Sequence, residues 1–434
     1  MLLQFAFKNY KSFRDEATLD LTVAEPNETL ENELDADAEQ GRYVARNGEK
    51  VLRAAAIYGA NGGGKSNVVN AFQAMRWCVL RSFGFGDDRA DNFAQTPDFP
   101  RPFLFDTENK NRPTEFEVYF LAPDVPDKVY NYGFTIGRDG VGEEWFNVKN
   151  AAKNERFRRV FYRNTETGEL KFSRFTEAAK ANIQSALRKE TLVVSLGVKL
   201  NVKPLKVVWD FFAAVDVLCF GSPLMNLILS KTFATLAEDE EPDAFFGEIT
   251  PFIQKFDSSI VRVKYEIKDD GEGGQKVRLF AGHKTQDSDE LTYLPFQEES
   301  DGTQKMLALY PYLRQVFDRG ALLFVDELNA RLHPLLQRSI LTSFLDPEQN
   351  PNGAQLVFTT HEPWLLDCGL LRRDEIWFVQ KGDFGASTLY SLAEFDENGD
   401  RPNYQEDYLL GKYGAIPRLT ALRSGDAKES NDER

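Results

Sequence analysis

The sequence contains little cysteine, and the few cysteines are scattered. There are three in 434 residues, Cys78, Cys219 and Cys368, and their spacing fits neither a metal site nor a disulfide framework. This excludes a disulfide-stapled fold and predicts buried thiols in a cytoplasmic protein. Long apolar runs are also absent, because no stretch approaches the ~20 apolar residues of a membrane span. The opening residues lack a long apolar core and a small-residue cleavage site, so we expect no signal peptide.

Runs of basic residues are rare as well. The formal net charge is −16 and the pI is about 4.9. Proteins that hold DNA through its phosphates usually present a basic face. The short cluster Arg-Phe-Arg-Arg at 156–159 has the composition of a solvated surface. A membrane partner is not expected, and DNA stays open as a partner without support from the charge.

The sequence does contain enough apolar residues for a large core. Hydrophobic residues make up 42% and aromatic residues 13% of the chain, as in folded globular proteins. Alternating apolar and polar residues predict several strands. They lie in an edge hairpin at 2–7 and 17–21, from 115 to 172, and at 260–267 and 276–280. From 176 to about 251 the pattern is mostly helical, and 25–40 and 84–101 look like loops.

The most informative segment is IYGANGGGKSN at 57–67. It matches G-x-x-x-x-G-K-[ST], between a strand predicted at 51–58 and a helix predicted at 68–80. A flexible glycine-rich turn is the alternative, but the flanking elements are those that a phosphate-binding loop (P-loop) requires. Lys65 would reach the β- and γ-phosphates, and the Ser66 hydroxyl would ligate Mg²⁺. We therefore predict ATP and Mg²⁺ as ligands, with contacts from Gly59, Asn61, Gly62, Gly63, Gly64, Lys65, Ser66 and Asn67.

A second motif, ALLFVDE at 321–327, is an apolar strand that ends in two carboxylates. A buried parallel strand with acids only at its carboxyl end places them at the ligand edge of a sheet. Asp326 has the chemistry to bind Mg²⁺, and Glu327 that of a general base acting on water. A core strand that ends in a solvated acidic turn is the alternative.

Between these motifs lies ESDGTQ at 299–304, which opens a helix predicted from the apolar spacing of the next residues. Ser300 followed by Gly302 at a helix N-terminus is an anion-binding arrangement. The same residues also fit an ordinary helix N-cap. The segment precedes the 321–327 strand by one helix, and this position decides for the first interpretation because it resembles the order found in ATP-binding-cassette ATPases.

The order of these motifs resembles the ATP-binding-cassette (ABC) ATPase superfamily, in its SMC/RecF/OLD-like branch. The P-loop, a signature-like SDGTQ, a Walker B strand, a D-loop-like segment at 328–334 and a strand at 355–360 ending in His361 follow in family order. NYKSF at 9–13, LHP at 332–334 and the wide separation of P-loop and signature also look like this branch. The resemblance implies an α/β P-loop NTPase of the ABC-ATPase head type. An N-terminal antiparallel β element and a helical and β lobe inserted between Walker A and signature would accompany it.

The resemblance also implies a division of the chain and a division of labour. Residues 1–140 would be the first half of the head with the P-loop, 141–290 the inserted lobe, and 291–434 the signature helix, Walker B strand and switch histidine. Two heads would sandwich two nucleotides, so the chain would form a homodimer or higher oligomer. The implied roles are cis nucleotide and metal contacts for Lys65, Ser66, Asp326 and Glu327, trans γ-phosphate contacts for Ser300 and Gly302, and γ-phosphate sensing for His361. His333 fits a functional or a structural role equally, and Gln95 is a weakly supported Q-loop candidate.

Two further segments, RDEIWFV at 373–379 and YLLGKYGAIP at 408–417, resemble the stand-alone SMC-like ATPases of bacterial anti-phage defence operons. These are the RloA and AbiL types and, more distantly, the ATPase of the PARIS system. By residue pattern alone both segments also fit a core strand and a packed turn. The resemblance implies ATP hydrolysis coupled to head pairing that holds or gates a separately encoded, often nuclease-like effector.

Two alternatives remain at this stage. One is a RecF-like repair ATPase that binds DNA, against which the acidic charge counts. The other is an OLD-like ATPase with a nuclease in the same chain, which needs a Glu and an Asp-x-Asp pair on successive strands. The DSD triplet at 287–289 has that spacing but lies in a polar segment that looks like a loop.

Overall fold

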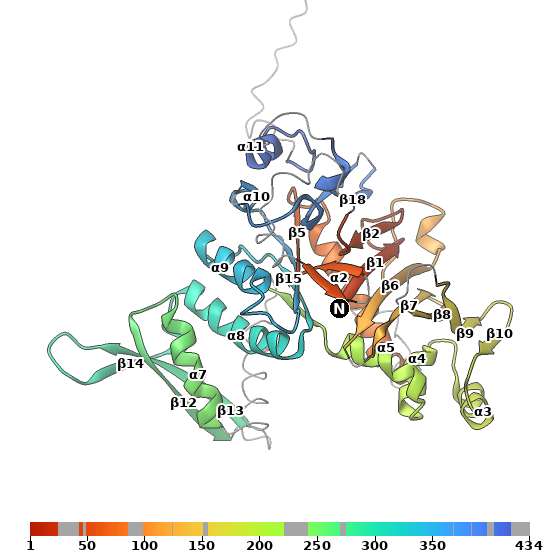
Figure 1. The fold of residues 1–434 in the computed structure, drawn as a ribbon, viewed down its shortest axis with the longest axis horizontal. Coiled ribbons are helices and arrows are strands. Elements are labelled where there is room, and N and C mark those ends of the chain that lie inside the picture. The colour runs from red at the N-terminus through yellow and green to blue at the C-terminus, as the bar shows by residue number, and fades with distance from the viewer. Residues whose placement is uncertain are drawn as a thin grey trace, which may run out of the picture.

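The computed structural model describes the chain except for residues 25–42, 47–48, 86–98, 124, 151–154, 221–241, 270–274, 368, 383, 397–402 and 418–434. The described strands form four sheets. The molecule is elongated, with an arm of β12–β14 at one end and strands β8–β10 at the other (Figure 1). The ATPase motifs lie between these two ends.

The strands are β1 (Leu2–Lys8), β2 (Ala17–Asp20), β3 (Tyr43–Arg46), β4 (Glu49–Leu52), β5 (Ala54–Gly59), β6 (Thr114–Ala122), β7 (Val125–Gly137), β8 (Gly140–Asn150), β9 (Arg158–Asn164), β10 (Glu169–Phe172), β11 (Asp216–Cys219), β12 (Ile260–Asp269), β13 (Gln275–Lys284), β14 (Leu291–Pro295), β15 (Leu322–Asp326), β16 (Gln355–Thr359), β17 (Ile376–Lys381) and β18 (Ser387–Ser391). The α-helices are α2 (Lys65–Arg81), α3 (Glu177–Ala186), α4 (Val193–Lys199), α5 (Lys203–Ala213), α7 (Pro242–Gln254), α8 (Asp301–Arg319), α9 (Pro334–Leu345), α10 (Trp364–Asp367) and α11 (Tyr404–Leu409). Short 3₁₀ turns are η1 (Ser82–Gly84), η3 (Asn109–Asn111), η4 (Phe296–Glu298), η5 (Arg373–Glu375) and η6 (Leu392–Glu394).

The larger sheet is antiparallel and has the order β10-β9-β8-β7-β6-β1-β2. The hairpin predicted at 2–7 and 17–21 is confirmed, since β1 pairs with β2 and β2 is the edge strand. The strands predicted between 115 and 172 belong to the same sheet. The boundary expected at residue 140 falls inside the paired hairpin of β7 and β8, so the sheet continues across it.

The second sheet carries the nucleotide-binding motifs and has the order β11-β15-β16-β5-β17-β18. Its first five strands are parallel, and only β18 is antiparallel to its neighbour. The strand β11 corrects the helical expectation for 176–251, because four residues are too few to show a strand period. The strand predicted at 51–58 is two strands, with β4 in a separate hairpin with β3 and β5 in the parallel sheet.

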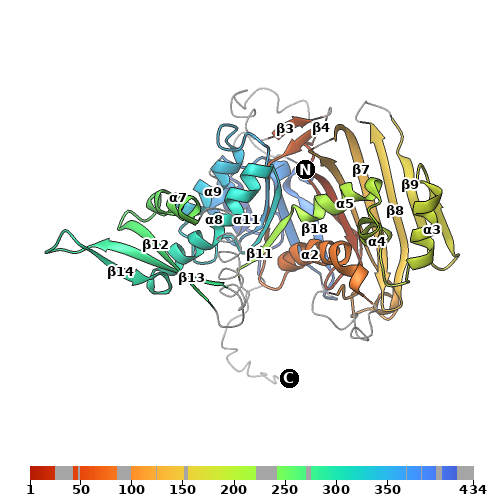
Figure 2. The ribbon, with the colours of Figure 1, turned by 90° about the horizontal axis from the view of Figure 1, so that it is seen from below.

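Helix α2 lies between the two sheets (Figure 2). Its Phe72 stacks on Phe324 of β15 with ring centroids 4.4 Å apart, and meets Phe5 of β1 edge-on at 5.1 Å. On the other face of the parallel sheet, apolar residues of α8, α9 and the 404–416 segment pack against Tyr58, Phe358 and Phe378. The P-loop strand is therefore buried on both faces, which explains its unbroken apolar sequence.

The arm is a smaller unit built on helix α8. Strands β12, β13 and β14 form an antiparallel sheet, and α7 packs on it through Ile249 and Ile253. Leu307 and Tyr310 of α8 belong to the same cluster. The DSD triplet at 287–289 lies in the exposed connection between β13 and β14, as the loop interpretation predicted. Gln95, the acidic segment 25–40 and the turn at 270–271 lie outside the described residues.

One buried carboxylate joins the large sheet to helix α4. Glu144 on β8 is fully buried. It accepts hydrogen bonds from the Tyr132 hydroxyl at 2.9 Å and from the backbone N–H groups of Val193 and Val194 at 2.6 and 3.2 Å. Burial raises the pKa of Glu144 to about 7, against the attraction of Arg163 and these donors.

The raised pKa makes the stability of the fold depend on pH. Because the folded-state pKa exceeds that of the unfolded chain, Glu144 favours folding below about pH 4.5, and this contribution is lost as pH rises through about 7. Glu144→Gln does not ionise, so between pH 5 and 8 the variant should gain about 3 kcal/mol in unfolding free energy relative to the parent. Urea unfolding across this range measures the difference. The exposed Glu166→Gln is the control, and parallel curves for Glu144→Gln and the parent would contradict the prediction.

Candidate functional site

The predicted nucleotide-binding residues meet at one edge of the parallel sheet. Strand β5 ends in the P-loop at Gly59, β15 ends at Asp326, and β16 leads to His361. These strands are parallel neighbours, so their carboxyl ends lie on the same side. Figure 1 shows β5 and β15, two strands of this sheet, with α2 beside them.

The P-loop has a backbone that only glycine tolerates at two positions. A Cβ at Gly59 would lie 2.4 Å from the Val379 carbonyl oxygen of β17. Gly64 has φ +120°, and a Cβ there would lie 2.6 Å from the Ser387 hydroxyl. Both substitutions would force the loop away from its neighbours, which agrees with the motif's demand for these glycines.

Three side chains from distant parts of the chain hold the loop in place. The Ser387 hydroxyl donates to the Gly63 carbonyl at 2.6 Å, and its oxygen is hydrogen-bonded to the Ser12 hydroxyl at 2.8 Å. The Asn67 side-chain amide also donates to Ser12, at 2.8 Å. Ser12 belongs to the NYKSF segment, which is thereby given a structural role beside the P-loop.

Lys65 lies at the centre of the site. Its ammonium donates to the carbonyls of Gly59 and Ala60 at 2.8 and 3.2 Å and lies 3.5 Å from His361 Nδ1. Burial lowers the pKa of Lys65 to about 8, against the attraction of Asp326 and Glu327. Burial, and then the Lys65 charge, also lower the pKa of His361. Lysine, histidine and both carboxylates therefore share one electrostatic environment.

Thr359, the last residue of β16, connects the two carboxylate residues. Its hydroxyl donates to Asp326 Oδ1 at 2.6 Å and accepts from the backbone N–H of Glu327 at 2.7 Å. Glu327 has φ +58°, a left-handed conformation that is uncommon outside glycine. Within the described part of the chain its half-buried carboxylate accepts no hydrogen bond. The side chain is therefore held by its backbone and remains free to bind water.

The residues present fit a nucleotide-bound magnesium ion. Mg²⁺ is commonly held by one or two protein oxygens, phosphate oxygens and water. Ser66 is the second residue of helix α2, directly after Lys65, and Asp326 uses only Oδ1 for Thr359, which leaves Oδ2. No cluster of three or more His, Cys, Asp or Glu ligands exists among the described residues.

The signature-like segment forms the N-terminus of the 19-residue helix α8. Ser300 is the N-cap, and its hydroxyl accepts from the backbone N–H of Thr303 at 3.1 Å. A Cβ at Gly302 would lie 3.2 Å from the Arg331 carbonyl. Ser300 is exposed. The capping role is thus real, and it leaves an open helix N-terminus at the surface.

The D-loop-like segment contains both a structural and a linking residue. His333 is the N-cap of α9, where Nδ1 accepts from the backbone N–H of Leu335 at 3.2 Å. This contact favours its structural interpretation. Asn329 lies closer to the site, because its side-chain oxygen accepts from the backbone N–H of His361 at 3.3 Å.

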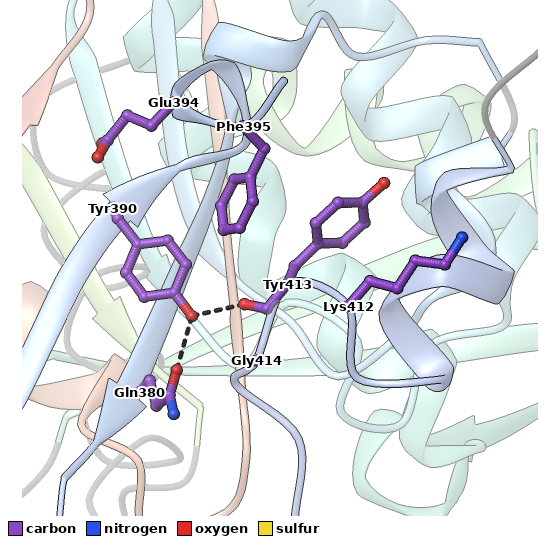
Figure 3. Close-up of a pocket in the computed structure, with 7 residues that line it drawn as sticks. All are labelled: Gln380, Tyr390, Glu394, Phe395, Lys412, Tyr413 and Gly414. Carbon is purple, nitrogen blue, oxygen red and sulfur yellow. Dashed lines mark hydrogen bonds between the residues drawn. The ribbon is translucent and has the colours of Figure 1, made fainter. Parts of the chain in front are cut away.

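The 408–417 segment packs behind the P-loop strand. The Tyr408 ring lies 5.8 Å from that of Tyr58, and the Tyr408 hydroxyl donates to the Ala415 carbonyl at 3.4 Å. Beside this segment is an open hollow of about 420 Å³ (Figure 3). There the Tyr390 hydroxyl donates to the Tyr413 carbonyl at 2.6 Å and bonds Gln380 Oε1 at 3.1 Å. The hollow is lined by none of the P-loop, Walker B or signature residues.

Several residues near the site were not predicted from the sequence. Thr359 and Ser387 are the last residue of one strand and the first of another, and Ser12 lies in a turn. Lys305, in the second turn of α8, donates to three backbone carbonyls after the Walker B strand. The sequence signal for Lys305 was its position directly after the signature-like segment.

The comparison with family models gives one match that covers residues 54–367, more than two thirds of the chain. The model describes an AAA domain, putative AbiEii toxin, type IV toxin–antitoxin system. The chain belongs to this family. It is therefore a P-loop ATPase with the α/β head that the motifs predicted, and the matched region contains the P-loop, Ser300, Asp326 and His361.

Structural comparison gives a weaker likeness. A structure of the recombination mediator protein RecF with ATP, from the RecFOR pathway, has 10% sequence identity and a TM-score of 0.32, with 90% of this chain and 97% of that chain covered. A TM-score this low supports no conclusion about function. The comparison with curated proteins finds no match. Among the described helices of this AAA ATPase, none has the length and hydropathy of a membrane span.

The Thr359 bridge leads to a test of the site. Thr359→Val keeps the shape of the side chain but removes the donor to Asp326 and the acceptor for the Glu327 N–H. Displacing Glu327, which we expect to act as the general base, by a fraction of the reacting distance should lower ATP turnover about 10- to 100-fold. Steady-state hydrolysis and nucleotide binding without Mg²⁺ measure the effect, and the second quantity should not change.

Thr360→Val is the matched control. Among the described residues the Thr360 hydroxyl accepts only from the N–H of Glu362 in the next turn, at 3.0 Å, so this variant should keep the parent turnover. Equal activity of Thr359→Val and Thr360→Val would show that the bridge does not position Glu327.

Proposed function

We propose that this AAA ATPase is a nucleotide-driven assembly switch, which binds Mg-ATP at the P-loop and hydrolyses it in a pair of heads. The observation that carries the proposal is the placement of Lys65, Asp326, Glu327 and His361 at one sheet edge while the signature-like helix N-terminus stays exposed. The hydrogen bonds of Ser300 within the described residues are with Thr303 and Gln304. Its anion-binding end is thus available to a nucleotide held by a second copy.

The chain's own residues have distinct tasks in this mechanism. Bound Mg²⁺ would neutralise phosphate charge, and Ser66 and Asp326 are the residues that would hold it. Lys65 exchanges its carbonyl partners for phosphate oxygens, and its charge is thereby stabilised. Glu327 orients water for in-line attack on the γ-phosphate, and His361, beside Lys65, senses that phosphate. Hydrolysis removes the group that Ser300 and Gly302 of the partner contact, so the pair loosens.

At the level of biology, we propose that head pairing holds or gates a separately encoded effector in anti-phage defence. The family description, which names a toxin–antitoxin system, supports this role. The RDEIWFV strand and the 408–417 segment, which resemble defence ATPases, meet at the back of the P-loop strand, where Tyr408 lies 5.5 Å from Phe378. A change of the P-loop between nucleotide states would therefore act directly on the packing of these two segments.

The first test separates binding from hydrolysis. Glu327→Gln should retain ATP binding, lower turnover about 100-fold or more through loss of the general base, and trap a dimer. Light scattering with ATP should then give twice the monomer mass of 49.4 kDa. The exposed Glu348→Gln is the control. Hydrolysis by Glu327→Gln at the parent rate would contradict the assignment of the base.

The second test concerns the biological output. The chain expressed with its neighbouring reading frames should reduce phage plating, and Lys65→Ala should abolish the protection because it removes the charge that holds the β- and γ-phosphates. The exposed Lys203→Ala is the control. Protection by Lys65→Ala equal to that by the parent, or replication and repair genes as the only neighbours, would count against the defence role and favour the RecF-like alternative.

A further inference from the structure

Lys305 is a buried lysine with an unusual set of partners. It lies in α8, five residues after Ser300, and its side chain is only 6% exposed. Its ammonium donates to the backbone carbonyls of Glu327, Leu328 and Ala330 at 3.1, 2.8 and 2.7 Å. An ammonium has three N–H donors, so all three are used on one turn. We call residues 327–332 the catalytic turn.

The burial of Lys305 is costly unless these contacts are made. Desolvation lowers the pKa of Lys305 to about 7, against the attraction of Glu327. The ring of Phe220, just after β11, lies 4.1 Å from the ammonium, and an aromatic face favours a cation there. A methionine or leucine would fill the same space without the desolvation cost. The position therefore has a task that packing alone does not explain.

The contacts of Lys305 join the catalytic turn to helix α8. In a pair of heads these two elements would belong to different nucleotide sites. The catalytic turn carries Glu327, which would act on the nucleotide of its own subunit. Helix α8 begins at Ser300 and Gly302, which would contact the nucleotide of the partner. Two further contacts join the same parts, the Arg331 ion pair with Asp301 at 3.2 Å and the close approach of Gly302 to the Arg331 carbonyl.

Two residues of the catalytic turn have uncommon backbone conformations that the Lys305 contacts help to hold. Glu327 and Arg331 both have positive φ values, +58° and +60°. Such conformations persist only where the surroundings hold them. Lys305 bonds the carbonyl of Glu327 and the carbonyl of Ala330, just before Arg331, so it holds the turn between the two strained residues.

We propose that Lys305 is a positioning residue that ties the signature helix to the catalytic turn, so that engagement of a partner's nucleotide by Ser300 and Gly302 sets the position of Glu327 in the same subunit. This inference rests on the proposed pairing of heads. It explains how each subunit withholds hydrolysis until it is paired. A lone subunit has every residue that acts in cis. Its Glu327 takes up the catalytic position only when Ser300 and Gly302 contact a partner's nucleotide.

Lys305→Met tests the link, because it keeps the length and apolar stem of the side chain and removes the three donors. Without nucleotide, hydrogen exchange should accelerate at the amides of 327–332 and not at the P-loop. With ATP, binding and dimer formation should match the parent, while kcat falls about 10- to 100-fold with KM unchanged. The variant should therefore behave as a weaker form of Glu327→Gln.

A double variant separates positioning from a general loss of stability. If Lys305 acts through Glu327, Lys305→Met combined with Glu327→Gln should be no slower than Glu327→Gln alone. The matched control is Arg314→Met, which removes another cation of α8 that pairs with Glu248 of α7 at 3.3 Å. This control should keep the parent kcat and the parent exchange at 327–332.

The outcomes distinguish the link from the function on which it rests. Parent kcat and parent exchange in Lys305→Met, with Glu327→Gln inactive, would overturn the role of Lys305 and leave the ATPase mechanism intact. Loss of ATP binding together with faster exchange throughout the molecule would also overturn it, because Lys305 would then be only a structural residue. Hydrolysis by Glu327→Gln at the parent rate would instead overturn the underlying mechanism.

Discussion

The parallel pairing of β5 between β16 and β17 is the constraint on which the site depends. It pairs Gly59 with Val379 of β17 and Ile57 with Thr359 of β16, so the P-loop strand has a paired neighbour on each side. The Val379 carbonyl then approaches Gly59 so closely that no side chain fits. The register thus fixes the positions of Gly59, of the end of β17 and of Thr359 relative to one another. The geometry of the site is therefore set by the sheet.

Electrostatics within the site follow from this packing. Two carboxylates at the end of β15 lie near a lysine and a histidine whose pKa values burial lowers. The Lys65 ammonium donates to two neutral backbone carbonyls. A charged phosphate oxygen is a stronger acceptor for an ammonium than a neutral carbonyl is. A bound triphosphate therefore relieves a partly unsatisfied charge. This prepares Lys65 to bind phosphate.

The motifs were predictable because each one is local in sequence. IYGANGGGKSN and ALLFVDE specify turn, strand and ligand within a few residues, and His361 follows a recognisable strand. Thr359, Ser387 and Lys305 were not predictable, because their partners lie 33, 324 and 22 residues away and only the pairing of strands brings them close. The strand β11 was missed because its four residues carry no period, and its place is set by β15. The roles proposed for Ser300, Gly302 and His361 remain predictions.

The same logic bears on why the chain should act as a pair. In the proposed mechanism one subunit supplies the P-loop, metal ligands and general base. Its signature-like helix begins at the surface, and Lys305 of that helix donates to carbonyls of the catalytic turn. A helix N-terminus attracts an anion only over its first turn. In the proposed pair, Ser300 would therefore contact a phosphate of the nucleotide that the other subunit holds. The lysine that joins this helix to Glu327 would be unnecessary in an ATPase that worked alone. Its burial between the N-terminal end of α8 and the catalytic turn links the part of the chain proposed to act in trans to the part proposed to act in cis.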